Sequence, residues 1–129
     1  MLSAEDLANA VEDEFGVKYS KDGLRLLQSN ENITNYVVKA GTRVICDGAF
    51  DNCSGLISVT IPNSVKSIGD GAFAHCSGLT SVTIPNSVKS IGDHAFYKCS
   101  SLKYIIIPSG TKPKFARLLP DNKSQLVAQ

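Results

Sequence analysis

The stretch SVTIPNSVKSIGD occurs twice, at residues 58–70 and, letter for letter, at residues 81–93. The second copy starts 23 positions after the first, and the longer segments 51–73 and 74–96 that contain them differ at only four positions. Repetition at a fixed spacing of this length is typical of stacked structural units rather than of one irregular core. The repeat therefore predicts a solenoid.

Weaker copies of the unit flank the two good ones. Upstream, residues 32–50 keep Ile45 and the run DGAF, and downstream residues 98–112 begin another copy and then depart from it. Terminal coils of a solenoid meet a cap or solvent on one side, so their sequences drift. We expect one domain over residues 1–129, with about three to four coils at residues 32–109 between an N-terminal helical cap and entry segment (1–31) and a C-terminal helical cap (110–129).

Each unit carries the signals of two short extended segments and a turn. Apolar and polar residues alternate at 82–84, which predicts a strand with one buried face. Pro85 ends this strand because proline has no amide hydrogen to give to a sheet. Residues 88–91 predict a second extended piece, and Asp93 is placed to cap a single helical turn that carries residues 95–96.

Stacked coils would bring equivalent apolar residues together at the roughly 4.8 Å spacing of neighbouring strands. Four buried rows are expected: Leu56, Leu79 and Leu102; Val59, Val82 and Ile105; Ile61, Ile84 and Ile107; and Phe50, Phe73 and Phe96. A single coil cannot bury its own apolar face, whereas an identical neighbour offers it a matching one. The expected fold class is an α/β repeat solenoid, short and right-handed, with a parallel β-sheet and helical caps at both ends.

The pattern LxxVxIPxxVxxIGxxAFxxC, present at residues 56–76 and 79–99, resembles that of the BspA-like leucine-rich repeat family, a bacterial and protist branch of the leucine-rich repeat solenoids. The resemblance covers the segment from Ile33 to Ile107. It implies a curved parallel-sheet solenoid that serves in binding. Some larger secreted members of this family are reported to be adhesins.

Residues 1–31 predict a cap. Ser3 followed by Asp6 resembles a capping box, and Leu7, Val11 and Phe15 recur every four residues. Residues 3–14 are therefore expected to form an amphipathic helix that lies across the first coil as a lid. Residues 19–28 carry a turn signal at Asp22 and Gly23 and predict a hairpin-like entry to the repeats.

Residues 110–129 predict a second cap. Thr111 is placed to cap a helix, Pro113 suits its first turn, and Pro120 stops it. Its apolar face is Phe115, Leu118 and Leu119, and a last short helix is expected around Leu126 and Val127. Caps at both ends favour a complete protein.

Composition excludes few classes of function. Apolar residues make up 43% of the chain and charged residues 19%, and the formal net charge is +1. This balance gives no overall attraction to nucleic acid or to membranes. Residues 1–15 lack the continuous apolar run of a signal peptide or a membrane span. A cytoplasmic location is expected, with a secreted or surface location as the alternative if a leader was removed.

The cysteines predict a core role. Cys53, Cys76 and Cys99 share one register position, and Cys46 stands where later units have glycine. A zinc site needs ligands that converge on a tetrahedron, whereas a row of parallel side chains is collinear. Parallel Cβ vectors also disfavour a disulfide between neighbouring coils. We expect small buried thiols, no metal site and no cofactor.

No catalytic site is predicted. His75 and His94 fall at different register positions, and neither has a recurring acidic or serine partner placed as in a catalytic triad. The sequence also lacks a glycine-rich phosphate loop and a metal-binding helix motif. The chain is expected not to be an enzyme.

A row of cations follows the repeat period. It consists of Arg43, Lys66, Lys89 and Lys112. Such a row would attract an acidic partner or a phosphate backbone. The alternative, which we favour, is a solvated row beside the aspartates Asp47, Asp70 and Asp93, because exposed ion pairs are common and weak. The absence of interleaved aromatic residues disfavours nucleic acid.

The outward face of the first predicted strand is the better candidate surface. Its two rows are Asn35, Ser58, Ser81 and Tyr104, and Val37, Thr60, Thr83 and Ile106. Tyr104 and Ile106 beside serine and threonine would form an anchor patch, because aromatic residues dominate many interfaces. The alternative is that the C-terminal segment folds over these two residues.

The sequence thus predicts a small binding module whose partner is a protein, held through Tyr104, Ile106, Ser81, Thr83, Ser58 and Thr60. The alternative is a trimmed cell-surface adhesin-like protein that binds a host or matrix protein. No nucleic-acid or membrane partner is expected. The sequence leaves the partner's identity and the oligomeric state open.

Overall fold

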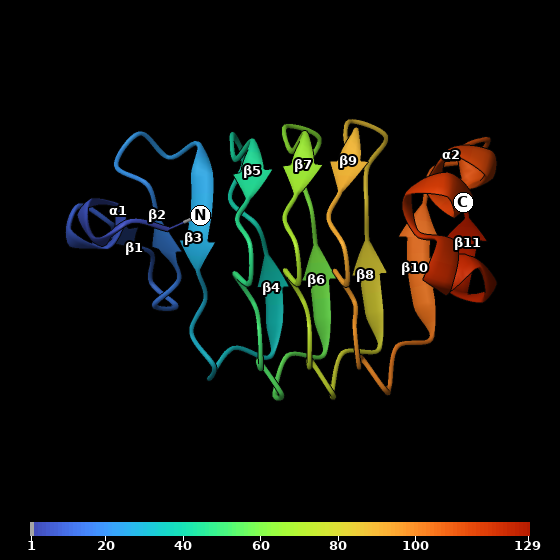
Figure 1. Cartoon of the computed structure of the whole chain (residues 1–129), viewed down its shortest axis with the longest axis horizontal. Coiled ribbons are helices and arrows are strands. Elements are labelled where there is room, and N and C mark those ends of the chain that lie inside the picture. The colour runs from blue at the N-terminus through green and yellow to red at the C-terminus, as the bar shows by residue number, and fades with distance from the viewer. Residues whose placement is uncertain (1) are drawn as a thin grey trace.

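The chain winds through two sheets that share one core (Figure 1). The computed structural model describes residues 2–129. One sheet, called the first sheet, contains β4 (Asn35–Val37), β6 (Ser58–Thr60), β8 (Ser81–Thr83), β10 (Tyr104–Ile107) and β11 (Leu126–Ala128). The second sheet contains β1 (Val11–Glu12), β2 (Lys18–Tyr19), β3 (Arg25–Gln28), β5 (Val44–Ile45), β7 (Ser67–Ile68) and β9 (Ser90–Ile91). The second extended piece of each unit therefore builds a sheet of its own.

Strand register follows the sequence period. In the first sheet Val59 pairs with Val82, and in the second sheet Ile68 pairs with Ile91, both in parallel orientation. Each of these pairs joins residues that lie 23 positions apart. The predicted repeat solenoid with parallel strands is confirmed.

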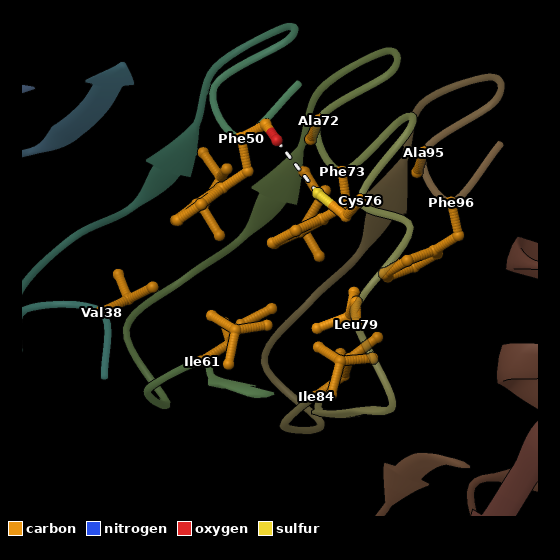
Figure 2. Close-up of a cluster of buried hydrophobic side chains, with 14 of the residues drawn as sticks. Val38, Phe50, Ile61, Ala72, Phe73, Cys76, Leu79, Ile84, Ala95 and Phe96 are labelled. Carbon is orange, nitrogen blue, oxygen red and sulfur yellow. Dashed lines mark hydrogen bonds between the residues drawn. The ribbon is translucent and has the colours of Figure 1, made fainter. Parts of the chain in front are cut away.

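The four predicted apolar rows form the core. All twelve of their members are buried. The phenylalanine rings stack face to face, with 4.7 Å between the ring centroids of Phe50 and Phe73 and 5.3 Å between those of Phe73 and Phe96 (Figure 2). Rings held at this distance bury apolar surface on both faces, which a coil without a neighbour cannot do.

Between the second sheet and the next coil, the chain forms a ridge of tight turns, at residues 47–53 and their equivalents. The predicted helical turn capped by Asp93 is wrong. The Asp47 side chain instead accepts a hydrogen bond from the Asp70 amide, and the Asp70 side chain accepts one from the Asp93 amide, each at 2.8 Å. The aspartates thus link coils, because the next coil places an amide against each of these carboxylates.

This link explains the glycines beside it. A methyl group at Gly69 would come within 2.5 Å of the Asp47 main-chain nitrogen, and Gly92 is crowded by Asp70 in the same way. The first coil carries Cys46 at this position, because the residue 23 places before Asp47 is Leu24 and no aspartate approaches. Glycine is therefore required only where a preceding coil supplies the aspartate.

We expect Gly69→Ala to lower the free energy of unfolding by about 1–3 kcal/mol, because the added methyl forces main-chain atoms apart. Gly55→Ala is the control, since its added methyl would meet only atoms 3.7 Å away, an ordinary contact. Urea unfolding of both variants checks the prediction. Equal stability of the two variants would contradict it.

The N-terminal cap is mostly β-structure. Helix α1 spans only Ala4–Ala8, with the predicted Ser3 capping box in place. The predicted lid helix over residues 3–14 is wrong: Val11 lies in β1, antiparallel to β2, and Leu7, Val11 and Phe15 are all exposed. The helix ends at Ala8, and the Asp13 side chain accepts hydrogen bonds from the amides of Phe15 and Val17, which stabilises the turn between β1 and β2. The predicted hairpin at residues 19–28 is confirmed as the antiparallel pair β2 and β3.

A hydrogen-bonded chain of hydroxyls joins this cap to the first coil. The Tyr19 and Tyr36 hydroxyls lie 2.6 Å apart, and the Tyr36 hydroxyl donates to the Asp13 carboxylate at 2.5 Å. Burial raises the pKa of Tyr36 above its usual value, and acceptance by Asp13 raises it further, so this hydroxyl stays protonated. The cap is therefore fixed to coil one by a buried polar contact.

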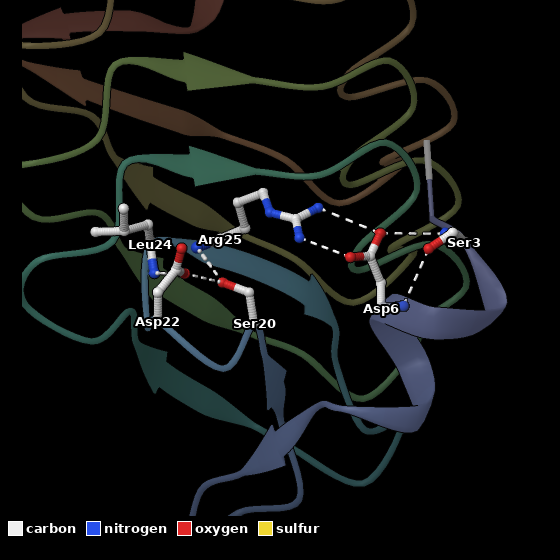
Figure 3. A network of polar contacts seen from close by, with 6 residues as sticks. All are labelled: Ser3, Asp6, Ser20, Asp22, Leu24 and Arg25. Atoms are coloured by element: carbon white, nitrogen blue, oxygen red, sulfur yellow. Dashed lines mark hydrogen bonds and ion pairs between the residues drawn. The ribbon is translucent and has the colours of Figure 1, made fainter.

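Helix α1 is held by an ion pair (Figure 3). The Arg25 guanidinium of β3 bonds both oxygens of Asp6, at 2.7 and 3.3 Å. The hydrogen bond from Arg25 and the Ser3 main-chain amide lower the pKa of Asp6 below its usual range. Ser20 and Asp22 extend this network on the neighbouring turn, where the Ser20 hydroxyl donates to Asp22 at 2.7 Å and accepts from the Arg25 amide at 3.0 Å.

The Asp6 carboxylate should make stability depend on pH. A lowered folded-state pKa contributes stability that is present above the unfolded pKa of about 3.9 and is lost as pH falls toward the folded value. The melting temperature of the wild type should therefore exceed that of Asp6→Asn at pH 6, and the difference should shrink below about pH 4. Glu5→Gln, which neutralises another carboxylate of α1, is the control. A difference for Asp6→Asn that stays constant from pH 6 to pH 3 would contradict the prediction.

The C-terminal cap returns to the first sheet. Helix α2 spans Lys112–Leu118 with Pro113 in its first turn, as predicted, and a 3-10 helix, η1, follows at Pro120–Gln125. The Thr111 hydroxyl donates to the Pro108 carbonyl instead of capping α2. The predicted last short helix is wrong: Leu126 and Val127 form β11, which pairs in parallel with β10. The open edge of β10 provides the hydrogen-bond partners that make a strand favourable here.

Candidate binding surfaces

The two predicted rows of the first sheet lie in register. Ser58 pairs with Asn35 and Ser81, and Ser81 pairs with Tyr104. Thr60, Thr83 and Ile106 form the second row, which begins at Val37 and gains Val127 from β11. We call these two rows the sheet face. The Ser58 hydroxyl donates to the Asn35 side chain at 2.7 Å, which links these two side chains along the row.

The ends of the sheet face are its most apolar exposed parts. Val37 is 69% exposed and Tyr104 is 53% exposed. Ile106 is half-buried between Thr83 and Val127. The C-terminal segment therefore lies beside Tyr104 and Ile106 as another strand and leaves Tyr104 open. Sequence reasoning gave Val37 no part in the binding patch and missed Val127, because the return of the chain to the sheet has no local signal.

A shallow hollow borders the face. It has a volume of about 290 Å³, and its lining includes Thr83, Pro85, Ile106, Pro108 and Gln129. This lining combines apolar side chains with uncharged polar ones. The sheet face and this hollow form a surface suited to a flat or extended partner.

The cationic row is shorter than the sequence predicts. Stacking of Arg43, Lys66 and Lys89 is shown by main-chain bonds of 2.8 Å, from the Lys66 amide to Arg43 and from the Lys89 amide to Lys66. Lys112 does not continue the row, because it begins helix α2. Lys114 lies near the end of the row instead. Its ammonium donates to the Asn86 carbonyl at 2.6 Å, and burial together with the charge of Lys89 lowers the pKa of Lys114.

The aspartates do not pair with these cations. Within residues 2–129, the ion pairs are Arg25 with Asp6 and His75 with Asp51. The Asp47 and Asp70 carboxylates point to amides of the following coil. The cationic row is therefore exposed to solvent and forms no ion pair with any carboxylate of the described chain.

All four cysteines are buried and free, as predicted. The Cys76 thiol donates to the Phe50 carbonyl at 3.0 Å (Figure 2). In the next coil the Cys99 thiol donates to the Phe73 carbonyl at 3.0 Å. Burial raises the pKa of Cys46 and of Cys53 above the usual value for a thiol. Over the described residues 2–129, no three His, Cys, Asp or Glu side chains gather in a way that could hold a metal ion.

One histidine has an acidic partner that the sequence did not predict. His75 Nδ1 lies 3.1 Å from Asp51 Oδ1, and both side chains are exposed. The two residues are diagonal neighbours in adjacent coils, so an offset of 24 instead of 23 is the signal that would have found them. Tyr97 packs edge-on against both His75 and His94, with ring centroids 5.5 and 5.1 Å apart. In the part of the chain that the structure describes, no hydroxyl or thiol bonds to His75.

The buried cysteines should be labelled slowly in the folded protein. A thiol enclosed by the core is out of reach of a reagent in solution, and the raised pKa of Cys46 and Cys53 also keeps these two in the unreactive protonated form. All four should therefore react with a disulfide reagent at pH 8 far more slowly in buffer than in urea. Absorbance of the released thiolate measures the rate. Rapid reaction of even one cysteine in the folded protein would contradict the burial described here.

Known proteins share this repeat geometry. The family model described as BspA type leucine rich repeat region matches residues 26–114 in six copies. A leucine rich repeat protein of T. pallidum is 24% identical with a TM-score of 0.61, covering 84% of this chain and 53% of that one. The pneumococcal vaccine antigen PcpA is 20% identical with a TM-score of 0.66, covering 81% of this chain and 32% of that one.

A third solved structure is described as a leucine rich cell surface protein of Faecalibacterium prausnitzii. It is 28% identical with a TM-score of 0.57, covering 93% of this chain and 38% of that one. This chain thus spans about half or less of each of these three proteins. No match was found among curated protein sequences.

Two further observations bear on the class of protein. Over residues 2–129, every helix is too short or too polar to cross a bilayer. The family match covers more than half of the chain, and its limits enclose every strand from β4 to β10. The chain therefore belongs to the BspA type leucine rich repeat family, and it resembles bacterial members of that family with known structures.

Proposed function

We propose that the chain is a non-enzymatic binding module that holds a protein partner on the sheet face. The residues assigned to the contact are Tyr104, Ile106, Ser81, Thr83, Ser58 and Thr60. The observation that carries the proposal is an exposed tyrosine on a strand whose neighbours on both sides are hydrogen-bonded. A rigid aromatic side chain loses little entropy on binding, which suits it as an anchor.

The chemistry of the face favours a protein over other partners. Serine and threonine hydroxyls at its centre offer hydrogen bonds, and apolar side chains lie at both ends. The rows themselves contain no lysine or arginine, so the face lacks the cations that phosphate recognition requires. A shallow, extended surface with mixed chemistry is typical of protein interfaces rather than of sites for small molecules.

Val37 extends the proposed contact to the opposite end of the face. It is the most exposed large apolar side chain of the described residues, and it lies on β4, the outer strand of the first sheet. A partner long enough to reach from Tyr104 to Val37 would bury both apolar ends and pair with the hydroxyls between them.

A second candidate is a cell-surface protein that binds a host or matrix protein. The description of the Faecalibacterium prausnitzii relative as a cell surface protein favours it. The same sheet face would serve in either location, so the two candidates differ in the partner and not in the site.

The proposal predicts a loss of binding on changing the anchor residues. Tyr104→Ala with Ile106→Ser should abolish specific capture of a partner from lysate of the source cells and from preparations of host surface and matrix proteins. Alanine substitution of an anchor residue typically costs about 2 kcal/mol or more in binding. The control is Ile57→Ser, which removes an exposed apolar side chain outside the two rows.

Each outcome is decisive once equal melting temperatures show that both variants fold. A partner that is held by the wild type and the control and lost by the double variant supports the sheet face. Its source, lysate or surface preparation, distinguishes the two candidates. Equal capture by all three proteins would exclude the sheet face and leave the row of Arg43, Lys66 and Lys89 as the next surface to test.

A further inference from the structure

Three amides in each ridge donate to the next coil. In the ridge at residues 47–53, the amides of Gly48, Phe50 and Asn52 donate to the carbonyls of residues 70, 72 and 74 at 2.7–2.9 Å. One coil later, the amides of Gly71, Phe73 and His75 donate to Asp93, Ala95 and Tyr97 at 2.8–2.9 Å. Every second amide of a ridge therefore points toward the C-terminal end of the solenoid and meets a carbonyl there.

The last ridge has the same donors without acceptors. Its equivalent amides belong to His94, Phe96 and Lys98, and none of the three donates to an acceptor within residues 2–129. The ridge keeps the conformation of its predecessors, because His94 has φ of 59° where Gly71 has 59°, and Lys98 has 56° where His75 has 61°. The three donors are thus held in place by the fold and lack a partner in the described chain.

A groove lies where the missing acceptors would be. It separates residues 91–98 of the last coil from residues 118–122 of the C-terminal cap, and its volume is about 400 Å³. We call it the cap groove. The cap passes this position as the end of α2 and the start of η1, and none of the cap's carbonyls accepts a hydrogen bond from the three amides. Its volume falls in the range of ligand sites.

We propose that the cap groove binds a peptide segment of a partner protein through main-chain carbonyls at alternate residues. The amides of His94, Phe96 and Lys98 would donate to these carbonyls as the two earlier ridges donate to the next coil. The site is distinct from the sheet face, so this proposal does not depend on the proposed function.

The lining favours a peptide over a small anion. In the earlier ridges each of the three amides meets a separate carbonyl, so the donors are spaced for a main chain and do not converge on one atom. Asp93 and Asp121 line the groove beside Lys98, so the lining carries more carboxylates than ammonium groups and does not favour an anion. Tyr97, which is exposed and packs against His94, supplies an apolar wall for the side chains of the peptide.

Small side chains suit the segment that binds. The residues that meet the earlier ridges include Ala72 and Ala95, which are buried between coils. Leu119 of the cap lines the groove together with Phe96, so a large residue next to the central carbonyl would collide with it. A suitable probe is therefore the acetylated and amidated peptide of residues 69–76 with Asp70 replaced by asparagine, Phe73 by alanine and Cys76 by serine.

Hydrogen exchange of the free protein tests the premise. The amides of His94, Phe96 and Lys98 should exchange at least roughly ten times faster than those of Gly71, Phe73 and His75, whose hydrogen bonds open only with the coil. Similar protection in both sets would show that the last ridge is already paired and would overturn the proposal.

Titration of the probe into ¹⁵N-labelled protein tests the site. The amide protons of His94, Phe96 and Lys98 should shift downfield and saturate, while those of Gly71, Phe73 and His75 stay in place. Leu118→Trp, which fills the groove, should weaken binding at least tenfold, and Lys123→Trp, an exposed change outside the groove, should leave it unchanged.

Asn122→Trp replaces Leu118→Trp if the latter does not fold, because residue 122 lines the same groove. The proposal is overturned by shifts that map outside the groove, by equal affinity of the filled and control variants, or by no shift of the three amides up to about 5 mM peptide, beyond the weakest affinity of interest.

Discussion

Main-chain hydrogen bonds between successive coils are the constraint on which the rest of the structure depends. These bonds require every coil to place its main-chain donors and acceptors opposite those of the next coil. Paired residues are therefore separated by 23 positions, which is the length of the repeat. The apolar rows, the stacked phenylalanine rings and the aspartate links all follow from this register. Gly69 and Gly92 follow from it as well, since the aspartate of the preceding coil leaves no room for a side chain.

The repeated part of the chain could be predicted because its residues meet copies of themselves. Val82 and Phe73, for example, each lie between the equivalent residues of the two adjacent coils. The repeat therefore predicts the neighbours of each residue as well as its position. The role of Asp93 could not be predicted in the same way. An aspartate before a turn is a local signal for a helix cap. The equivalent residues Asp47 and Asp70 instead accept hydrogen bonds from main-chain amides of the next coil, which no local signal indicates.

The caps were harder because their partners are not copies. Residues 3–14 have a helical apolar period, yet the helix ends at Ala8 and the chain continues as β1, which pairs with β2 across a turn that Asp13 stabilises. Leu126 and Val127 are strand residues only because β10 offers them an open edge. Lys112 shares the period of the cationic row but lies in a helix, since the chain leaves the repeat before it. In each case the contacts that a cap makes, and not a copy of the repeat, decide the local structure.

The candidate sites divide along the same line. The repeat period predicts which residues form the two rows of the sheet face. The solvent exposure of Tyr104 could not be predicted, because it depends on where the C-terminal strand β11 lies. The amides of His94, Phe96 and Lys98, which have no acceptor within residues 2–129, could not be found from side chains because they belong to the main chain. The cap groove lies where the stacking of coils stops, next to main-chain donors that no following coil accepts.

Removal of one whole repeat tests the account most directly. Deleting residues 58–80 joins Ile57 to Ser81 and keeps every row in register, whereas deleting residues 59–80 shifts all later positions by one. The account predicts that the first deletion leaves a protein with dispersed amide resonances and cooperative urea unfolding at lower stability, and that the second does not fold. Equal behaviour of the two deletions, whether both fold or neither does, would contradict the central role of the coil-to-coil register.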